Sequence, residues 1–172
     1  MESRRYSRRS GQVLLMVTLA LVPMFAFLGL VTDVGYMQYV KMSAQTAAEA
    51  AARAAIISYH ETVGGSNPQC GTGTGSVPCS AAAPTACPSN ITTPANFIER
   101  GCMYAQSHGF NSANQWVTYQ ANVHSVPPTA LGMGTATYWV TFRVIQKVPQ
   151  MFSAVLGNTS GMVSARSTTA VV

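Results

Sequence analysis

The sequence predicts an α+β fold in which one long N-terminal helix packs on a small antiparallel β-sheet. An uncharged, largely apolar run extends from Ser10 to Thr32, and an alanine-rich segment without glycine or proline follows from Tyr36 to His60. Two later segments alternate apolar and polar residues with a period of two, which is typical of half-buried strands. Packing the apolar faces of the helix and the strands against each other is the simplest way to bury both.

The uncharged run predicts a transmembrane helix, because it is long enough for the roughly 20 residues that a helix needs to span a hydrocarbon core. Arginines flank only its N-terminal end, so the positive-inside rule places residues 1–10 in the cytoplasm and the following domain outside. These arginines are Arg4, Arg5, Arg8 and Arg9. A cleaved secretory signal is the alternative, but its apolar region is normally only about 7–15 residues long. We therefore expect a retained anchor.

The composition also favours a membrane protein. Charged residues make up 9% of the chain and hydrophobic residues 48%, whereas soluble domains contain about 25% charged residues. The formal net charge of +5 belongs largely to the N-terminal tail. A basic tail next to an apolar span indicates membrane orientation, so we expect no nucleic-acid partner.

Residues 11–60 are predicted to form one nearly continuous helix, of which the first half crosses the membrane and the second half projects beyond it. Pro23 is predicted to kink the first half, because proline removes one backbone hydrogen bond. In the second half, polar residues recur every four positions: Lys41, Gln45, Glu49 and Arg53. Small residues allow close helix–helix approach, and we expect neighbouring copies or partner helices to bury a face made of Ala44, Ala47, Ala48, Ala51, Ala54 and Ala55. The alternative is that this face docks only on the protein's own sheet.

Residues 61–172 are predicted to form an exported α+β domain that begins with a long irregular loop, residues 62–94. Four cysteines lie in this loop or shortly after it: Cys70, Cys79, Cys87 and Cys102. An even number of cysteines in an exported segment indicates two disulfides, for which three connectivities are possible. A zinc site is the alternative, but the cysteines form no closely spaced pair.

The remainder of the domain is predicted to contain one short helix and three strands. The helix is expected at residues 94–109, although Gly101 weakens the pattern. Strands are expected at residues 115–123, 136–148 and 161–172, and a helical turn at residues 150–157. Together with the long helix, these elements would form the predicted α+β fold.

Three stretches, residues 8–55, 138–157 and 163–170, resemble the TadE/TadG-like proteins of the tight-adherence (Tad or Flp) pilus system. The first shows the family's order of basic residues, a glycine, an apolar helix, an Asp-x-Gly element formed by Asp33 and Gly35, an aromatic residue and an alanine-rich helix. The resemblance implies a pilin-like architecture and a role in building an adhesive surface pilus. It also implies a bacterial inner-membrane location, with the C-terminal domain in the periplasm or in an extracellular filament.

The resemblance to pilins further implies cleavage by a prepilin peptidase between Gly11 and Gln12. In pilin relatives this enzyme cuts after a glycine that follows basic residues. Processed pilins usually carry a glutamate five residues after the cut, where this chain has Met16. At the outer end of the span, Asp33 is expected either to cap a helical break together with Gly35 or to pair with a partner group. An ordinary interfacial aspartate is the third interpretation.

Catalytic motifs are missing from the sequence. It contains no GxSxG or HExxH motif, and the glycines at residues 71–75 lack the lysine of a phosphate loop. We therefore predict no enzyme activity, catalytic residue, metal, cofactor or small-molecule substrate. The predicted function is a pilin-like assembly component whose partners are the membrane and other pilins or pilus-assembly proteins, in a homo- or hetero-oligomer. The alternative is a membrane-anchored adhesin or binding module that uses the cysteine-containing loop.

Overall fold

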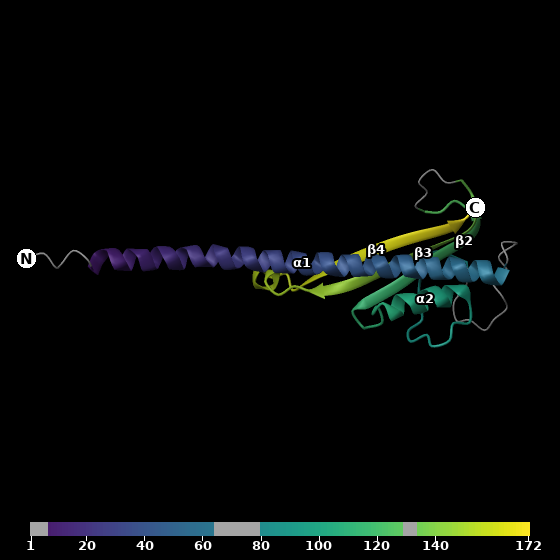
Figure 1. The fold of residues 1–172 in the computed structure, drawn as a ribbon, viewed down its shortest axis with the longest axis horizontal. Coiled ribbons are helices and arrows are strands. Elements are labelled where there is room, and N and C mark those ends of the chain that lie inside the picture. The colour runs from purple at the N-terminus through teal and green to yellow at the C-terminus, as the bar shows by residue number, and fades with distance from the viewer. Residues whose placement is uncertain (1–6, 64–79, 129–133) are drawn as a thin grey trace, which may run out of the picture. The chain divides into compact units, whose positions relative to one another are not determined.

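The computed structural model describes residues 7–63, 80–128 and 134–172. They form an α+β structure with a four-stranded sheet, as the sequence predicts (Figure 1). Its elements in chain order are α1 (Ser7–Val63), β1 (Ala81–Ala86), α2 (Phe97–Ser107), β2 (Gln115–Ser125), β3 (Ala136–Pro149), the 3-10 helix η1 (Ser153–Leu156) and β4 (Ser160–Val171).

The chain forms two compact units, and α1 contributes to both. The first, here called the anchor unit, comprises the chain up to Gln38 together with Pro149–Gly161. The second, here called the sheet unit, comprises Tyr39–Val148 and Met162–Val172. The predicted division into residues 1–10, 11–60 and 61–172 stays a prediction.

Helix α1 is continuous and slightly longer at both ends than predicted. It remains helical through Pro23, through Asp33 and through Gly35. The expectation that Asp33 and Gly35 cap a break in this helix is therefore wrong. A single glycine in a helix interior costs only about 1 kcal/mol relative to alanine, which is too little to end a helix of 57 residues. The kink at Pro23 stays a prediction.

In the sheet unit, the strands follow the order β1-β2-β3-β4, and β2 pairs antiparallel with β3 from Gln115 opposite Gln146 to Ser125 opposite Ala136. The apolar residues of the alternating pattern face the core, because the following residues are buried: Val117, Tyr119 and Ala121 of β2, and Tyr138, Val140, Phe142, Val144 and Val148 of β3. Val123, the next residue of this face of β2, is half-buried. In Figure 1 the C-terminal part of α1 runs across this sheet, with α2 beside it. Residues from both helices join the sheet residues in one core.

The centre of the core is a group of three aromatic rings. Tyr59 of α1 stacks on Tyr138 of β3 with 4.7 Å between the ring centroids, and Phe97 of α2 meets both rings edge to face. Such arrangements are favourable beyond the burial of their area, because the positive edge of one ring meets the negative face of another. The group therefore joins α1, α2 and the sheet at one point.

Strand β1 is a correction to the prediction of an irregular loop over residues 62–94. Its sequence, AAAPTA, contains Pro84 and no residue type with high strand propensity except Thr85. It lies at the edge of the sheet, and its pairing with β2 shifts register between Ala81 and Thr85. Proline is tolerated at sheet edges and irregularities because it cannot donate to the ladder. Composition alone therefore gave no sign of this strand.

Candidate functional site on helix α1

The side chain of Asp33 is buried in the anchor unit, where its carboxylate accepts four hydrogen bonds. Oδ1 accepts one from the Met151 amide at 3.1 Å. Oδ2 accepts three, from the Phe152 amide at 3.1 Å, the Ser153 amide at 2.8 Å and the Ser153 hydroxyl at 2.9 Å. Hydrogen bonds to an ionised acceptor are roughly twice as strong as neutral ones. Asp33 therefore has a partner group, as one of the three interpretations held, and the partner belongs to the same chain.

Two of these donors, the amide and the hydroxyl group of Ser153, belong to the first residue of η1, and the Met151 and Phe152 amides lie directly before it. The first amides of a helix have no acceptor within the helix and are normally capped by a nearby side chain. Phe152, the residue at the cap position, makes no side-chain cap bond. Asp33 supplies the missing acceptor from a distant part of the chain. At the other end of η1, Gly157 is left-handed with a φ of 94° and donates to Ala154.

One face of α1 receives the segment that follows β3. Gly29 lies one turn before Asp33, and a Cβ atom at Gly29 would overlap the ring of Phe152. Met37 lies one turn after Asp33, and its sulfur accepts a hydrogen bond from Gln150 Nε2 at 3.3 Å. The face formed by Gly29, Asp33 and Met37 is here called the docking face. Its spacing of four residues follows the helical repeat.

Gly35 does not belong to the docking face. It is exposed, and a Cβ atom built on it would meet nothing within 4 Å. Beside the segment after β3, the glycine that a close approach requires is therefore Gly29 and not Gly35. The spacing of Gly29 and Asp33 by four residues was visible in the sequence. Their contact residues lie about 120 positions later, and nothing in the local sequence points to them.

The N-terminal half of α1 presents large apolar side chains to its surroundings. Its exposed members are Val13, Leu14, Leu15, Met16, Val17, Leu19, Leu21, Val22, Met24, Phe25, Phe27, Leu28, Leu30 and Val31. Within the described chain, α1 is the one helix long and apolar enough to cross a membrane. The predicted cleavage residues Gly11 and Gln12 are exposed near the start of this helix. Cleavage itself stays a prediction.

The two threonine hydroxyl groups of this half donate hydrogen bonds within the helix itself. Thr18 donates to the carbonyl oxygens of Leu14 and Leu15 at 3.1 and 2.9 Å. Thr32 donates in the same way to Leu28 and Gly29 at 3.0 and 2.8 Å. Serine and threonine in helices often donate their hydroxyl hydrogen to a carbonyl oxygen three or four residues earlier. This bond replaces the one that the hydroxyl group would otherwise donate to water. Both hydroxyls are therefore compatible with an apolar environment.

The alanine face of α1 lies inside the sheet unit, which corrects the expectation that neighbouring copies bury it. Ala44, Ala47, Ala48, Ala51 and Ala55 are fully buried in the single chain, and Ala54 is half-buried. All five buried alanines belong to the core formed with α2 and the sheet. The alternative interpretation, docking on the protein's own domain, is correct for this face. The physical reason is that a small side chain suits any closely packed neighbour, whether it belongs to another chain or to the same one.

The close approach that these alanines allow is made to α2. A Cβ atom on Gly101 of α2 would lie 2.9 Å from the carbonyl oxygen of Ala51 and 2.5 Å from Cζ of Phe142. Gly101 lowers the helix propensity of its segment, yet α2 forms and is capped at its start by Asn96, whose side chain accepts from the Glu99 amide at 2.8 Å. Glycine at this position is therefore explained by helix packing.

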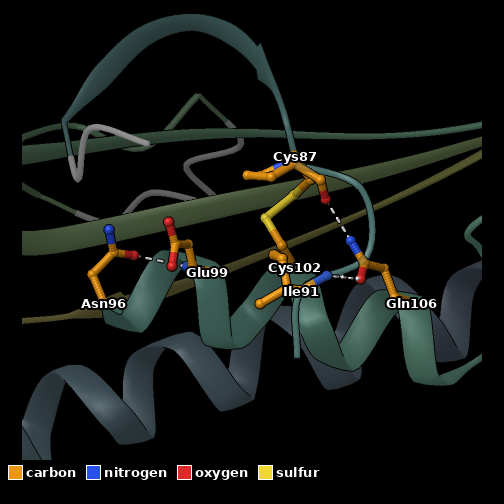
Figure 2. Close-up of a disulfide and its surroundings, with 7 residues drawn as sticks. Cys87, Ile91, Asn96, Glu99, Cys102 and Gln106 are labelled. Carbon is orange, nitrogen blue, oxygen red and sulfur yellow. Dashed lines mark hydrogen bonds between the residues drawn. A yellow bond between two sulfur atoms is a disulfide. The ribbon is translucent and has the colours of Figure 1, made fainter. Parts of the chain in front are cut away.

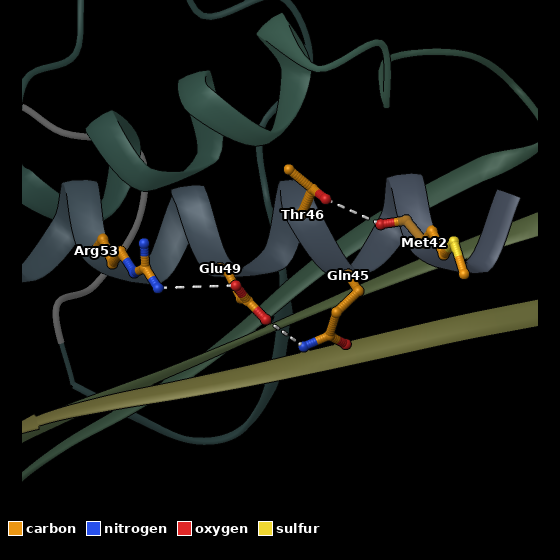
Figure 3. A network of polar contacts seen from close by, with 5 residues as sticks. All are labelled: Met42, Gln45, Thr46, Glu49 and Arg53. Carbon is orange, nitrogen blue, oxygen red and sulfur yellow. Dashed lines mark hydrogen bonds and ion pairs between the residues drawn. The ribbon is translucent and has the colours of Figure 1, made fainter. Parts of the chain in front are cut away.

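The predicted polar stripe of α1 is present on its more exposed side (Figure 3). Gln45 Nε2 donates to Glu49 Oε1 at 2.9 Å, and Arg53 lies 3.8 Å from Glu49 in the expected i,i+4 pair. Both partners of the ion pair are well exposed, so it contributes at most about 0.5 kcal/mol. The described contacts of this stripe are made within α1. They therefore identify no binding partner on this side of the helix.

Cys87 and Cys102 form a disulfide that joins the segment after β1 to α2 (Figure 2). Next to it, Gln106 accepts a hydrogen bond from the Ile91 amide and donates to the Pro88 carbonyl oxygen. Because both sulfur atoms are in the disulfide, neither can be a thiolate ligand of zinc. Of the three possible connectivities of two disulfides, only the one that pairs Cys87 with Cys102 and Cys70 with Cys79 contains this bridge. Cys70 and Cys79 lie outside the described residues.

The family comparison identifies the helix that carries these features. Residues 11–66 match the Tad family model, described as Flp pilus-assembly TadE/G-like. This segment of the chain is similar to the TadE/G-like family. The match covers 56 of the 172 residues and includes the exposed apolar half, the docking face and the alanine face of α1. No curated protein and no solved structure shows significant similarity to the chain. The TadE/G-like match supports a pilus-associated component, and its apolar helix indicates membrane anchoring.

Proposed function

We propose that this protein is a pilin-like structural component of a Tad-type pilus, anchored in the bacterial inner membrane. Its N-terminus faces the cytoplasm, and its C-terminal domain faces the periplasm or forms part of an extracellular filament. The protein acts through helix–helix association and not through catalysis. The observation that carries this proposal is the exposed apolar half of α1, which lies within the segment that matches the pilus-assembly family.

The association surface is assigned to this half because the alanine face is already covered within the chain. Leu19 has 75% of its surface exposed and Phe27 69%. In a bilayer, lipid covers such side chains, and helices associate there mainly by van der Waals packing. In a filament, the same side chains would have to be covered by helices of neighbouring subunits, because exposing them to water is unfavourable.

Processing at Gly11 is the second part of the proposal. Cleavage between Gly11 and Gln12 would remove the basic tail and leave the apolar helix at the new N-terminus. The measurement is the N-terminal sequence of the protein purified from cells that contain the matching pilus system. A mature chain that begins at Gln12 supports processing, and an intact basic tail contradicts it.

Site-specific photocrosslinking tests the association. A photoreactive amino acid at Leu19 is expected to crosslink to pilins or pilus-assembly proteins, because this side chain is exposed on the apolar half. The matched control is Ile57, which lies on the same helix in the sheet unit and is 58% exposed. Electron microscopy then compares pili of cells with and without the gene. Normal pili in the deletion strain would refute the proposed role.

The alternative function, a binding module, has one candidate cavity in the described part of the sheet unit. Its volume is about 290 Å³, and it lies beside Cys87 with Asn90, Gln106, Asn111 and Gln115 in its lining. These amides already have hydrogen-bond partners within the chain, as in the contacts of Asn111 with Asn90 and of Gln115 with Ser112. A ligand would have to compete with them, so the assembly role is the better-supported function.

A further inference from the structure

We propose that the segment Met151–Ser153, at the start of the connection between β3 and β4, is a second membrane contact. It inserts into the lipid interface of the outer leaflet, beside the outer end of α1. This inference rests on the proposed membrane anchor and adds a lipid-binding element outside the transmembrane helix. Four observations carry it.

The first observation is depth along α1. Phe152 packs against Gly29, and Gly29 lies three residues before Thr32, where the uncharged span ends. At 1.5 Å per residue, this contact is about 5 Å inside the end of the span. Interfacial elements typically bury their apolar faces about 5–10 Å into the boundary between headgroups and acyl chains. If α1 spans the bilayer, Phe152 therefore lies at interfacial depth.

The second observation is exposure. Met151 is 80% exposed and Phe152 is 49% exposed, although both side chains are large and apolar. Phe152 thus covers Gly29 with one part of its ring and leaves the rest free. In water these side chains would remain hydrated at a cost, whereas the lipid interface covers them without any rearrangement of the chain.

The third observation is charge. No charged residue occurs between Lys147 and Arg166, so the whole connection is neutral. A charged side chain on the connection itself would oppose insertion, because moving an ion out of water is costly. The charge that does lie beside Phe152 is the Asp33 carboxylate, which accepts four hydrogen bonds from the connection. The neutral stretch includes both ends of the connection, and the first charge on each side belongs to a strand.

The fourth observation concerns the backbone. A segment can enter an apolar region only if its amide groups find acceptors within the protein. Here the amides of Met151, Phe152 and Ser153 all donate to the Asp33 carboxylate. The amides of Gln150, Gly157 and Asn158 donate to backbone carbonyl oxygens of the same connection. Asp33 therefore makes the backbone of this segment compatible with the interface.

The test uses fluorescence quenching by lipid. The full-length Met151→Trp variant is reconstituted, at a high ratio of lipid to protein, in vesicles of phosphatidylcholine and phosphatidylglycerol. The phosphatidylcholine acyl chains carry bromine close to the headgroup. The wild-type protein, which contains Trp116 and Trp139, provides the background signal. We expect the added tryptophan to emit at shorter wavelength than in water and to lose fluorescence in the brominated vesicles.

The matched control is Asn158→Trp, at an exposed position on the same connection beyond Gly157. We expect its added fluorescence to be quenched less than that of Met151→Trp. Flotation of each variant with the vesicles is measured in parallel. If Met151→Trp floats with the vesicles and resists carbonate extraction but its added tryptophan is unquenched, this inference is wrong and the anchor stands. If the protein does not float at all, the anchor itself is wrong.

Discussion

The carboxylate of Asp33 accepts hydrogen bonds from both the amide and the hydroxyl group of Ser153, which lies 120 residues later in the chain. This contact holds the segment after β3 against a residue at the C-terminal end of the apolar span. It also explains how one acidic side chain can be buried there, since its lone pairs are directed at four donors of the same chain.

Replacing Asp33 with asparagine should loosen the connection between β3 and β4. An asparagine keeps the size of the side chain but substitutes an NH₂ group for one acceptor oxygen, so amide donors would face another donor. We expect faster hydrogen exchange at Met151, Phe152 and Ser153. The control is Thr32→Ala, which removes only a hydroxyl bonded to its own helix. Unchanged exchange at these three amides in the Asp33→Asn variant would contradict the assigned role.

Substitution of Ala51 by tryptophan should prevent folding of the sheet unit. Ala51 is fully buried in the core and its carbonyl oxygen faces Gly101, so a large side chain has no space. Overpacking of this kind costs about 1–3 kcal/mol or more, and we expect a lower steady-state level. The matched control is Met42→Trp on the same helix, where the native side chain is 70% exposed. Normal accumulation of Ala51→Trp together with a loss of pili would instead place this face at an interface between subunits.

Substitution of Gly101 by alanine should destabilise the protein even though alanine is the better helix former. The new methyl group would approach Phe142 and the carbonyl oxygen of Ala51, so α2 would have to move away from α1. We expect the free energy of unfolding to fall by about 1–3 kcal/mol, measured by urea unfolding of the full chain in detergent. Gly35→Ala provides the contrast, because it meets no atom within 4 Å. It should leave the stability unchanged or raise it by about 0.5–1 kcal/mol.

Removal of the disulfide by the double substitution Cys87→Ser and Cys102→Ser should lower the free energy of unfolding by about 3 kcal/mol. The two cysteines are separated by 15 positions, and closing a loop of this size restricts the unfolded chain by about that amount. The same experiment addresses Cys70 and Cys79, which can pair only with each other within one chain. Mass spectrometry of the unreduced wild-type digest should find a Cys70–Cys79 peptide. Free thiols at both positions would contradict this second bridge.

Alkaline pH should weaken the sheet unit through its buried tyrosines. Burial raises the pKa of Tyr119 to about 12, opposed by a hydrogen bond with Thr85, and burial also raises the pKa of Tyr138. Both rings remain protonated in the folded state at a pH where they ionise in the unfolded chain. The contribution of Tyr119 is therefore fully present below about pH 10 and is lost as the pH rises from there through about 12, and the contribution of Tyr138 is likewise lost as the pH rises above about 10. Urea midpoints measured between pH 9 and pH 12 should fall, and they should fall less in Tyr119→Phe.

The fold class was predictable because its strongest signals are periodic. The alternation in β2 and β3 showed which residues face the core, and the alanine-rich run predicted the continuous helix. The partners of those faces were not predictable in the same way. Ala51 meets Gly101 and Asp33 meets Ser153 through contacts between distant positions, and no local pattern encodes them. Gly101 weakened the sequence pattern of α2, because glycine has a low helix propensity. What favours glycine there is its close approach to Ala51 and Phe142, and the local sequence does not show these neighbours.

Between Val13 and Thr32 the only polar side chains are Thr18 and Thr32, and both hydroxyls are already bonded to their own helix. Polar groups are what usually fixes the rotation and the axial position of one helix against another. Contacts made by this stretch depend on shape alone. A neighbouring helix could turn or slide along it by exchanging one set of van der Waals contacts for another, without breaking a hydrogen bond. Such a surface would suit the proposed role, in which the protein exchanges lipid neighbours in a bilayer for protein neighbours in a pilus.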